Sequence, residues 1–568
     1  MSAEVRNSCL IILFYACITF PINLNAQEIT QEKKKESWFK RNVSLNGGFG
    51  ANLLYYNAWG IPPRVRPGTW MFNGNISLKI GQFNLPIGFL FTEQERRFLQ
   101  PFNQYGISPT YKWATIHLGY RSMAFSPYTL SGILFYGAGM EINPGKLRFS
   151  AMYGRLNRAV AEDTLKPNQG IPAFKRMGMG FKIGYGTPRN NLNLIYFQAT
   201  DDILSLPYVP ILSQLKPQDN KVFGMNFKFS IGKFFLDGDG AMSVFTRDKR
   251  DSLLIYQSEI KAFNNFQRFI QHRTSTQLSN AFQTAIGVAF KKFQLRLQYK
   301  RISPNYRSLG TFYFLTDIEN ITITPTFVFG KNKFRISISG GLQRDNTSGT
   351  KLATTVRQIG AINFSWAPKP EIGTDIQLNN FGTTQNPGTA PIQDSLKQYQ
   401  LTRSILITQR FGKSTKTKSR NISMTGSYQT FVDYNAFSRS FLQNKMVNFN
   451  ASYNLSIISK GIGFGGGIIT TQTQNEQFTN FQVGPQLNFT KSFLKGKINF
   501  NSGATILSSN SNLGSSGTNI SIFTSAGYMI SKRQRFQLNL NFIRSNGFTP
   551  NAPTFAELRF NAGYNFNF

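Results

Sequence analysis

Five basic residues alternate with apolar residues at a spacing of two, the pattern of charges on one face of a strand. They are Arg148, Arg296, Lys300, Arg335 and Arg559. Successive side chains of a strand point to opposite faces, so the apolar neighbours would take one face and these cations the other. Cations on the inner wall of a closed sheet favour anions. Alternatively, they pair with the 26 acidic residues or with lipid phosphates near the rims.

Catalytic chemistry has little support in the sequence. The two histidines, His117 and His272, lie in separate irregular segments, without a Ser/His/Asp order, paired acids or metal-ligand spacing around them. The glycine-rich run 461–467 lacks the Lys-Ser/Thr of a phosphate loop, which favours a strand. We therefore predict that the protein is not an enzyme and has no cofactor or metal.

A period of two runs through the chain and predicts long amphipathic strands. It is clearest at 293–300, 334–339, 536–542 and 558–568, where each stretch has one apolar and one polar face. The apolar faces are rich in Phe and Tyr, as in membrane barrels. Only a closed sheet pairs every backbone group of a lipid-facing strand. We predict an all-β fold, a single large antiparallel transmembrane β-barrel over 42–568.

Short turns alternate with longer polar connections. The short turns are rich in Gly, Pro, Asn or Lys and lie at 81–82, 143–145, 187–190, 232–233, 330–332, 367–370, 459–461 and 531–533. Tight periplasmic turns and long external loops have this asymmetry in bacterial outer-membrane barrels. The alternation gives about 24 strands, with a range of roughly 22–26. It fails between Arg97 and Ser131, which holds either two strands or an insertion.

Residues 98–130 combine many aromatic and basic side chains with poor alternation. One interpretation is an irregular strand pair in the wall. The other is an inward-folded plug or constriction, because a wall of about 24 strands encloses a lumen too wide for its own side chains to fill. The residues of that candidate constriction are Tyr105, Tyr111, Trp113, His117 and Arg121.

Residues 252–273 form a second candidate insert. Tyr256, Ile260 and Phe263 fall at intervals of four and three, which is the helical period. In a long external loop this predicts an amphipathic helix that acts as a lid or fills the lumen. A helix that rests on the barrel rim is the alternative.

The N-terminus has the features of a secretory signal peptide over 1–26. Arg6 precedes a short apolar stretch, and Leu24-Asn25-Ala26 offers a small-residue cleavage site. Both cysteines lie inside this segment, so the mature chain would contain no disulfide or zinc ligand of that type. Residues 27–41 would form a charged periplasmic tail. The net charge of +37 points to anionic partners, and the scattered basic residues without a recognition motif argue against nucleic acid.

The C-terminus resembles the terminal signal of bacterial outer-membrane β-barrel proteins. Asn561, Gly563, Phe566 and Phe568 match its polar, glycine and two aromatic positions. The resemblance implies location in the outer membrane, contact with its lipids and lipopolysaccharide, and recognition by the barrel-assembly machinery. The Asn- and Phe-rich strands and the Ala26-Gln27 junction also resemble exported proteins of Bacteroidota. Energised transporters carry an N-terminal plug domain, whereas strand-like sequence here begins near Asn42, which favours a porin-like barrel without that domain.

Two functional hypotheses follow. The first is an outer-membrane pore or passive transporter for anionic or polar solutes, because inward charges and inserts would shape a wide lumen. The second is a closed outer-membrane barrel that acts as a structural or assembly partner of an envelope, surface or secretion complex, because aromatic-rich inserts would fill the lumen or present a docking surface.

Overall fold

The computed structural model describes residues 42–93, 102–162, 171–208, 215–254, 269–312, 314–351, 353–387, 398–435, 438–512, 514, 516–546 and 553–568. The chain divides into two compact units, Met1–Ser44 and Leu45–Phe568. The second unit contains the barrel and is the one described below. The predicted signal peptide 1–26 and tail 27–41 lie outside the described residues.

Long antiparallel strands make up the wall. Its first part consists of β1 (Val43–Trp59), β2 (Gly68–Ile80), β3 (Phe83–Thr92), β4 (Gln104–Ile107), β5 (Thr110–Tyr111), β6 (Ala114–Ser122), β8 (Leu134–Ile142), β9 (Leu147–Asn157), β10 (Lys175–Gly186), β11 (Asn191–Asp202), β12 (Asp219–Ile231), β13 (Phe234–Thr246), β14 (Thr276–Ala289), β15 (Phe293–Ile302) and β17 (Ile318–Phe329).

The second part continues in the same up-and-down order. It consists of β18 (Phe334–Arg344), β19 (Ala353–Lys369), β20 (Ile372–Pro387), β21 (Gln398–Ser414), β22 (Lys418–Asp433), β23 (Asn444–Ile457), β24 (Ile462–Asn475), β25 (Thr479–Phe493), β26 (Ile498–Ser511), β27 (Ser516–Ser531), β28 (Gln534–Ser545) and β29 (Phe555–Asn567). The four strongly alternating stretches of the sequence fall in β15, β18, β28 and β29, because period-two alternation suits a sheet with one apolar and one polar face.

Helical structure among the described residues is limited to Asn42, residues 269–270 and a few short connections. These are η2 (Ile203–Ser205), α4 (Arg439–Leu442), η4 (Ile458–Lys460) and η5 (Leu494–Gly496). Within the described part of the chain, no helix combines the length and the apolar character needed to cross a bilayer.

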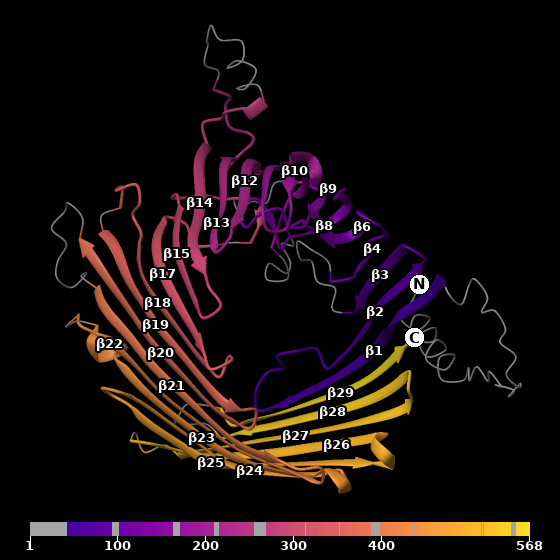
Figure 1. Ribbon diagram of the computed structural model, residues 1–568, viewed down its shortest axis with the longest axis vertical. Coiled ribbons are helices and arrows are strands. Elements are labelled where there is room, and N and C mark those ends of the chain that lie inside the picture. Colours follow the sequence, from indigo (N-terminus) through magenta and orange to yellow (C-terminus); the bar gives the residue numbers. More distant parts are fainter. Residues whose placement is uncertain are drawn as a thin grey trace, which may run out of the picture. The chain divides into compact units, whose positions relative to one another are not determined.

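The wall closes on itself between its first and last strands. β1 pairs with β29 in an antiparallel register that runs from Gly48 opposite Asn567 to Trp59 opposite Ala556. The described residues form a sheet of 27 strands, in which β4 and β5 both pair with β3 on one side and β6 on the other. These two share one position, so 27 less one gives 26 wall positions. The predicted large barrel is confirmed (Figure 1).

The strand number lies at the top of the predicted range rather than at about 24. The segment between Arg97 and Ser131 supplies two wall positions, one from β4 with β5 and one from β6. Short turns and longer connections then alternate from β1 to β29. β1 therefore begins, and β29 ends, on the side of the wall that carries the short turns.

The two faces of a wall strand differ in what covers them. On β11, Leu192 and Leu194 are 43% and 54% exposed, whereas the alternating Ile195 and Phe197 are 5% and 0% exposed. Exposed apolar side chains on a closed sheet suit lipid. The opposite, inner face is covered on this side by the segments around β7 (Leu130–Ser131) and β16 (Gly310–Thr311), which pack against it.

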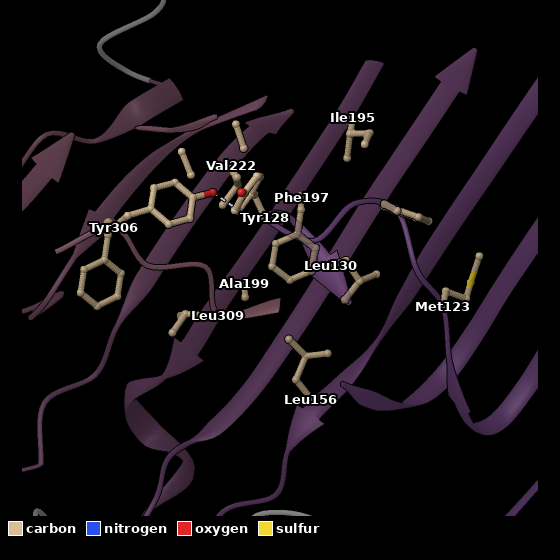
Figure 2. Packing of buried hydrophobic residues seen from close by; sticks show 14 of the residues in the cluster. Met123, Tyr128, Leu130, Leu156, Ile195, Phe197, Ala199, Val222, Tyr306 and Leu309 are labelled. Atoms are coloured by element: carbon tan, nitrogen blue, oxygen red, sulfur yellow. Dashed lines mark hydrogen bonds between the residues drawn. The ribbon is translucent and has the colours of Figure 1, made fainter. Parts of the chain in front are cut away.

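One apolar cluster joins these two inner segments to the wall. Phe125, Leu130 and Leu309 come from the inner segments, and they pack with side chains such as Phe197 and Val222 of the wall. Figure 2 shows Leu130 and Leu309 beside Phe197 and Ala199. The buried core of the described unit therefore lies inside the barrel, against strands from β8 to β17.

Candidate functional site

Two inward loops meet inside the barrel. We call them insert A, residues 123–133 between β6 and β8, and insert B, residues 303–317 between β15 and β17. Leu130 and Ser131 of insert A pair in parallel with Gly310 and Thr311 of insert B. The Ser308 hydroxyl also donates a hydrogen bond to the Thr129 carbonyl. The two loops form one unit although they are far apart in the sequence.

Insert B is fixed to the wall through Asn220 of β12. The Asn220 side chain accepts a hydrogen bond from the Leu309 amide at 2.9 Å and donates to the Ser243 hydroxyl at 2.8 Å. Ser243 in turn donates to the Arg307 carbonyl at 2.6 Å. Asn220 and Ser243 are fully buried. Polar residues on an otherwise apolar inner face thus satisfy the backbone of the loop, as burial requires.

Insert A is fixed to neighbouring strands in the same way. The Phe125 carbonyl accepts a hydrogen bond from the side-chain amide of Asn226 at 3.0 Å, and the Tyr128 hydroxyl donates to the Gln283 side chain at 3.0 Å. The Phe125 ring lies against Gly180, where an added Cβ would be 2.7 Å from the ring. Because Gly180 of β10 has no side chain, the Phe125 ring of insert A fits in the space beside it.

Tyrosines link the two inserts. The Tyr306 hydroxyl donates to the Tyr128 carbonyl at 2.6 Å, and the two rings meet edge to face with 6.2 Å between centroids (Figure 2). Burial raises the pKa of both hydroxyls. Each tyrosine therefore stays neutral and remains a hydrogen-bond donor over the physiological pH range.

A cationic cluster lies where insert B meets the loop ends of β10, β11 and β13. Arg176 forms a bidentate pair with Asp201, with distances of 2.7 and 2.9 Å. Lys249 donates to the Asp201 carbonyl at 2.6 Å. Arg307 of insert B lies over the Phe245 ring, 5.1 Å from its centroid, and its side chain is exposed. Arg176 thus pairs with the Asp201 carboxylate, whereas Lys249 binds the Asp201 backbone carbonyl.

Within this cluster, Arg307 is repelled by the positive charges of two neighbouring arginines. Partial desolvation of its otherwise exposed side chain lowers its pKa, and the positive charges of Arg176 and Arg247 lower it further, against the opposing effect of Asp201. A guanidinium stays charged even so. An anion that accepts hydrogen bonds from Arg307 would relieve this repulsion, and guanidinium groups suit carboxylate and phosphate oxygens.

The five basic residues singled out from the sequence occupy different environments. Arg296 pairs with Asp237 through distances of 3.0 and 2.9 Å, and Arg148 donates to the Gly186 carbonyl at 3.3 Å. Arg559 lies over the Tyr56 ring, 5.5 Å from its centroid. Lys300 is half-buried and Arg335 exposed. Arg296 is thus neutralised within the wall, while the structure brings none of the five into the Arg176–Arg307 cluster.

The residues proposed as a constriction lie in or between wall strands. Tyr105 is on β4, Tyr111 on β5, Trp113 in the turn before β6, and His117 and Arg121 on β6. The structure thus places them in the irregular strand pair of the wall. His117 Nδ1 lies 2.9 Å from the Ser108 hydroxyl, and Arg121 donates to the Gly106 carbonyl. These polar contacts span the break between β4 and β5.

The inward-folded element begins two residues after Arg121. The sequence prediction for 98–130 therefore included most of insert A, but named the wall residues before it. The sequence prediction did not mark insert B, which falls in one of the longer connections between strands. Its aromatic and apolar residues Tyr306, Leu309, Phe312 and Phe314 are unusual in a solvated loop and are the signal that would have marked it.

Most of the helical segment predicted within 252–273 lies outside the described residues. At its described end, Phe269 packs against Tyr196 and Phe223, with 5.9 and 6.4 Å between ring centroids. Both partners alternate with lumen-facing residues of β11 and β12, so this contact is on the outer side of the wall. The glycine-rich run 461–467 enters β24, as the strand interpretation predicts.

The residues that resemble an assembly signal lie on the closing strand β29. Phe566 stacks on Phe49 of β1 with 5.3 Å between centroids, and Phe568 meets Phe49 at 6.4 Å. Asn561 is opposite Leu54, and Gly563 is opposite Asn52. The aromatic residues thus contribute directly to the seam of the barrel.

No group of three or more potential metal ligands occurs among His, Cys, Asp and Glu of the described residues. The arrangement inside the barrel offers hydrogen-bond donors and fixed positive charge. It is suited to binding or admitting a solute.

No protein-family model matches the sequence, and no curated protein matches it. Among solved structures, OccK9 (OpdG) of Pseudomonas aeruginosa is 11% identical with a TM-score of 0.30, covering 94% of this chain and all 100% of its own. The P pilus usher (PapC) translocation pore is 9% identical with a TM-score of 0.36, covering 92% and 99%. The FrpB iron transporter of Neisseria meningitidis is 10% identical with a TM-score of 0.35, covering 92% and 81%.

Identities and scores this low carry no argument about activity. The class of protein follows from the barrel itself. Its even number of wall positions, its antiparallel up-and-down order and its exposed apolar face define a transmembrane β-barrel of the bacterial outer membrane.

Proposed function

We propose that this barrel is a pore or passive transporter that admits anionic and polar solutes. The observation that carries the proposal is the exposed Arg307 guanidinium, held on an inward loop near Arg176 and Arg247, with Asp201 as the nearby carboxylate. A fixed cationic cluster inside a barrel lowers the barrier for anions and raises it for cations. The solute would be a small carboxylate or phosphate compound.

Ion selectivity in planar bilayers tests this proposal. In a gradient of potassium chloride, the refolded barrel is expected to give a reversal potential that favours chloride. Arg307→Gln should reduce that preference, and the double change with Arg176→Gln should reduce it further. Lys532→Gln is the matched control, because it removes one positive charge from the short turn between β27 and β28. A barrel that conducts no ions, even after deletion of 252–273, would refute the pore.

Exposed apolar residues at the loop end favour a second candidate function. Leu204 is 91% exposed in η2, and Phe441 is 71% exposed in α4. Apolar side chains of this size on external loops suit contact with a partner protein of an envelope, surface or secretion complex. Gentle purification at native expression should then recover a stoichiometric partner, and Leu204→Ser with Phe441→Ser should release it. A solitary barrel argues against this function.

The closing strand supports a proposal about assembly. Phe566 and Phe568 would be recognised by the barrel-assembly machinery before they pack against Phe49. Replacing both with Ser should lower the amount of folded barrel in the outer membrane, measured by heat-modifiable gel migration. Phe464→Ser, on an exposed outer position of β24, is the control. Unchanged assembly of the double variant would refute the role.

A further inference from the structure

The wall is interrupted at the position shared by β4 and β5. β4 has four residues and β5 has two, with Ser108 and Pro109 between them. Gly119 of β6 adopts a φ of 88°, and a Cβ at this residue would lie 2.5 Å from the Tyr105 carbonyl oxygen. Only glycine allows this close approach with a positive φ. The interruption therefore follows from the sequence around Pro109 and Gly119.

An apolar groove of about 640 Å³ lies over this interruption. Its larger lining side chains include Ile87, Phe89, Tyr105, Ile107, Leu118 and Tyr136. Gly88 and Gly106 alternate with these side chains and face the other way, because a Cβ added at either glycine would lie 3.5 or 3.0 Å from Arg121. The lining side chains therefore belong to the face of the wall away from Arg121. Arg121 alternates with the exposed outer residues Ile116 and Leu118 on β6. The groove thus opens toward lipid.

The loop end of the groove is polar and carries a positive charge. Arg155 of β9 donates a hydrogen bond to the Tyr120 hydroxyl at 3.0 Å, and its guanidinium lies 5.2 Å from the Tyr136 ring centroid. The Tyr105 and Tyr136 hydroxyls are 3.1 Å apart. One cation and three tyrosine hydroxyls therefore converge where the apolar lining ends.

Arg155 forms no ion pair with any carboxylate of the described residues. It shares its face of β9 with Tyr153, which is 61% exposed. A cation on the lipid face is costly away from the interface, and near the interface it is stabilised by lipid phosphate. β9 runs from a short turn to a long loop, so Arg155 lies near the external leaflet.

We propose that this groove binds one phosphate-bearing lipid of the external leaflet. The phosphate accepts hydrogen bonds from Arg155 and the neighbouring tyrosine hydroxyls, while one acyl chain lies along Phe89, Ile107 and Leu118. Charge complementarity selects the headgroup, and the groove selects a chain over a bare phosphate ion. This site is on the opposite face of the wall from the Arg307 cluster, so it stands or falls independently of the pore.

Native mass spectrometry of the purified, folded barrel tests the site. The probes are monophosphoryl lipid A, phosphatidic acid, diacylglycerol and inorganic phosphate. Arg155→Gln removes the charge, and Leu118→Trp fills the groove while the charge stays. Arg403→Gln is the matched control, because Arg403 lies on the same outer face of β21 as Ile405 and Ile407, at the loop end of the strand. Heat-modifiable gel migration checks that each variant is folded.

The wild type and Arg403→Gln are expected to retain one phosphate-bearing lipid and to bind diacylglycerol weakly. Arg155→Gln should bind these lipids roughly tenfold more weakly, as for loss of a charge-assisted hydrogen bond. Leu118→Trp should also lose them. Equal retention by wild type and Arg155→Gln, equal binding of diacylglycerol, or displacement of the lipid by inorganic phosphate would overturn the proposal. So would a barrel dimer that dissociates in Leu118→Trp, because the groove would then hold a second copy.

Discussion

The inner face of the barrel differs between its two sides. Along β11 and β12 it presents Ile195, Phe197 and Val222, which the inserts bury. Along β23 to β25 it presents residues such as Asn454 and Asn488, whose side chains meet each other at 3.3 Å and remain exposed. The same strand architecture thus builds a packed side and a polar side. A wall strand can serve as core or as channel lining according to the residues at alternate positions.

The largest expected effect comes from removing a buried ring on the packed side. Phe197→Ala should lower the free energy of unfolding by about 3–5 kcal/mol, because the cavity would lie in the centre of the insert contact. Phe464→Ala on the outer face of β24, where Phe464 is 51% exposed, should cost much less. Urea unfolding followed by tryptophan fluorescence measures both. Similar losses would show that the packed side is no more tightly built than the lipid face.

A smaller effect is expected from an amide that holds insert B. Asn220→Leu removes the acceptor of the Leu309 amide and the 3.4 Å hydrogen bond that the Asn220 side chain donates to the Arg307 carbonyl, which should cost about 1–3 kcal/mol. Asn488→Leu is the same change on the polar side, where water can replace the lost partner. Limited proteolysis within 303–311 should become faster only in Asn220→Leu. Equal proteolysis of the two variants would mean that the wall does not hold the loop through Asn220.

The smallest expected effect concerns acid sensitivity of the loops over the packed side. Burial acts to raise the pKa of Asp317, but hydrogen bonds from Lys351 and Thr347 outweigh it and hold the pKa below its ordinary value. The charged form is therefore favoured in the folded state, and its contribution is present above the unfolded pKa and lost as pH falls through the folded pKa.

Hydrogen exchange measures this sensitivity. The Asn346 and Thr347 amides donate to Asp317 at 3.2 and 2.7 Å. Their protection should decrease below about pH 4, and Asp317→Asn should remove the pH dependence. Asp375→Asn, in the exposed pair with Arg410 on β20, should leave it unchanged. Protection that is constant down to pH 2 in the wild type would contradict the prediction.

The barrel could be predicted because its signals are local. Alternation such as Phe536 to Phe542 and turns such as Gly81-Gln82 each fix a strand or a reversal without reference to distant residues. The inserts depend on contacts between distant segments, so no local period marks them. A sequence signal for the inserts is nevertheless present in β11, where Leu194, Ile195, Tyr196 and Phe197 are consecutive apolar residues. Loss of alternation within a wall strand indicates that both of its faces are covered.

Basic residues on the inner face could be expected from the sequence, but the particular residues that form the cluster could not. Arg296 fits the expected pattern, yet Asp237 two strands away neutralises it. Arg307 lies in a loop without alternation, and its importance comes from Arg176 and Arg247, which are far away in the sequence. Strand parity gives the direction of a side chain, whereas electrostatic partners depend on register across several strands.

The contact between the inserts also sets an order of events for the growing barrel. Ser308 and Thr129 are separated by 179 residues, and the eight strands from β8 to β15 lie between them. Closing so long a loop is slow unless the intervening chain is already organised. The inserts therefore lock together only after this part of the wall has formed. Contact between the two inserts therefore requires that about a third of the barrel wall has already formed in the correct register.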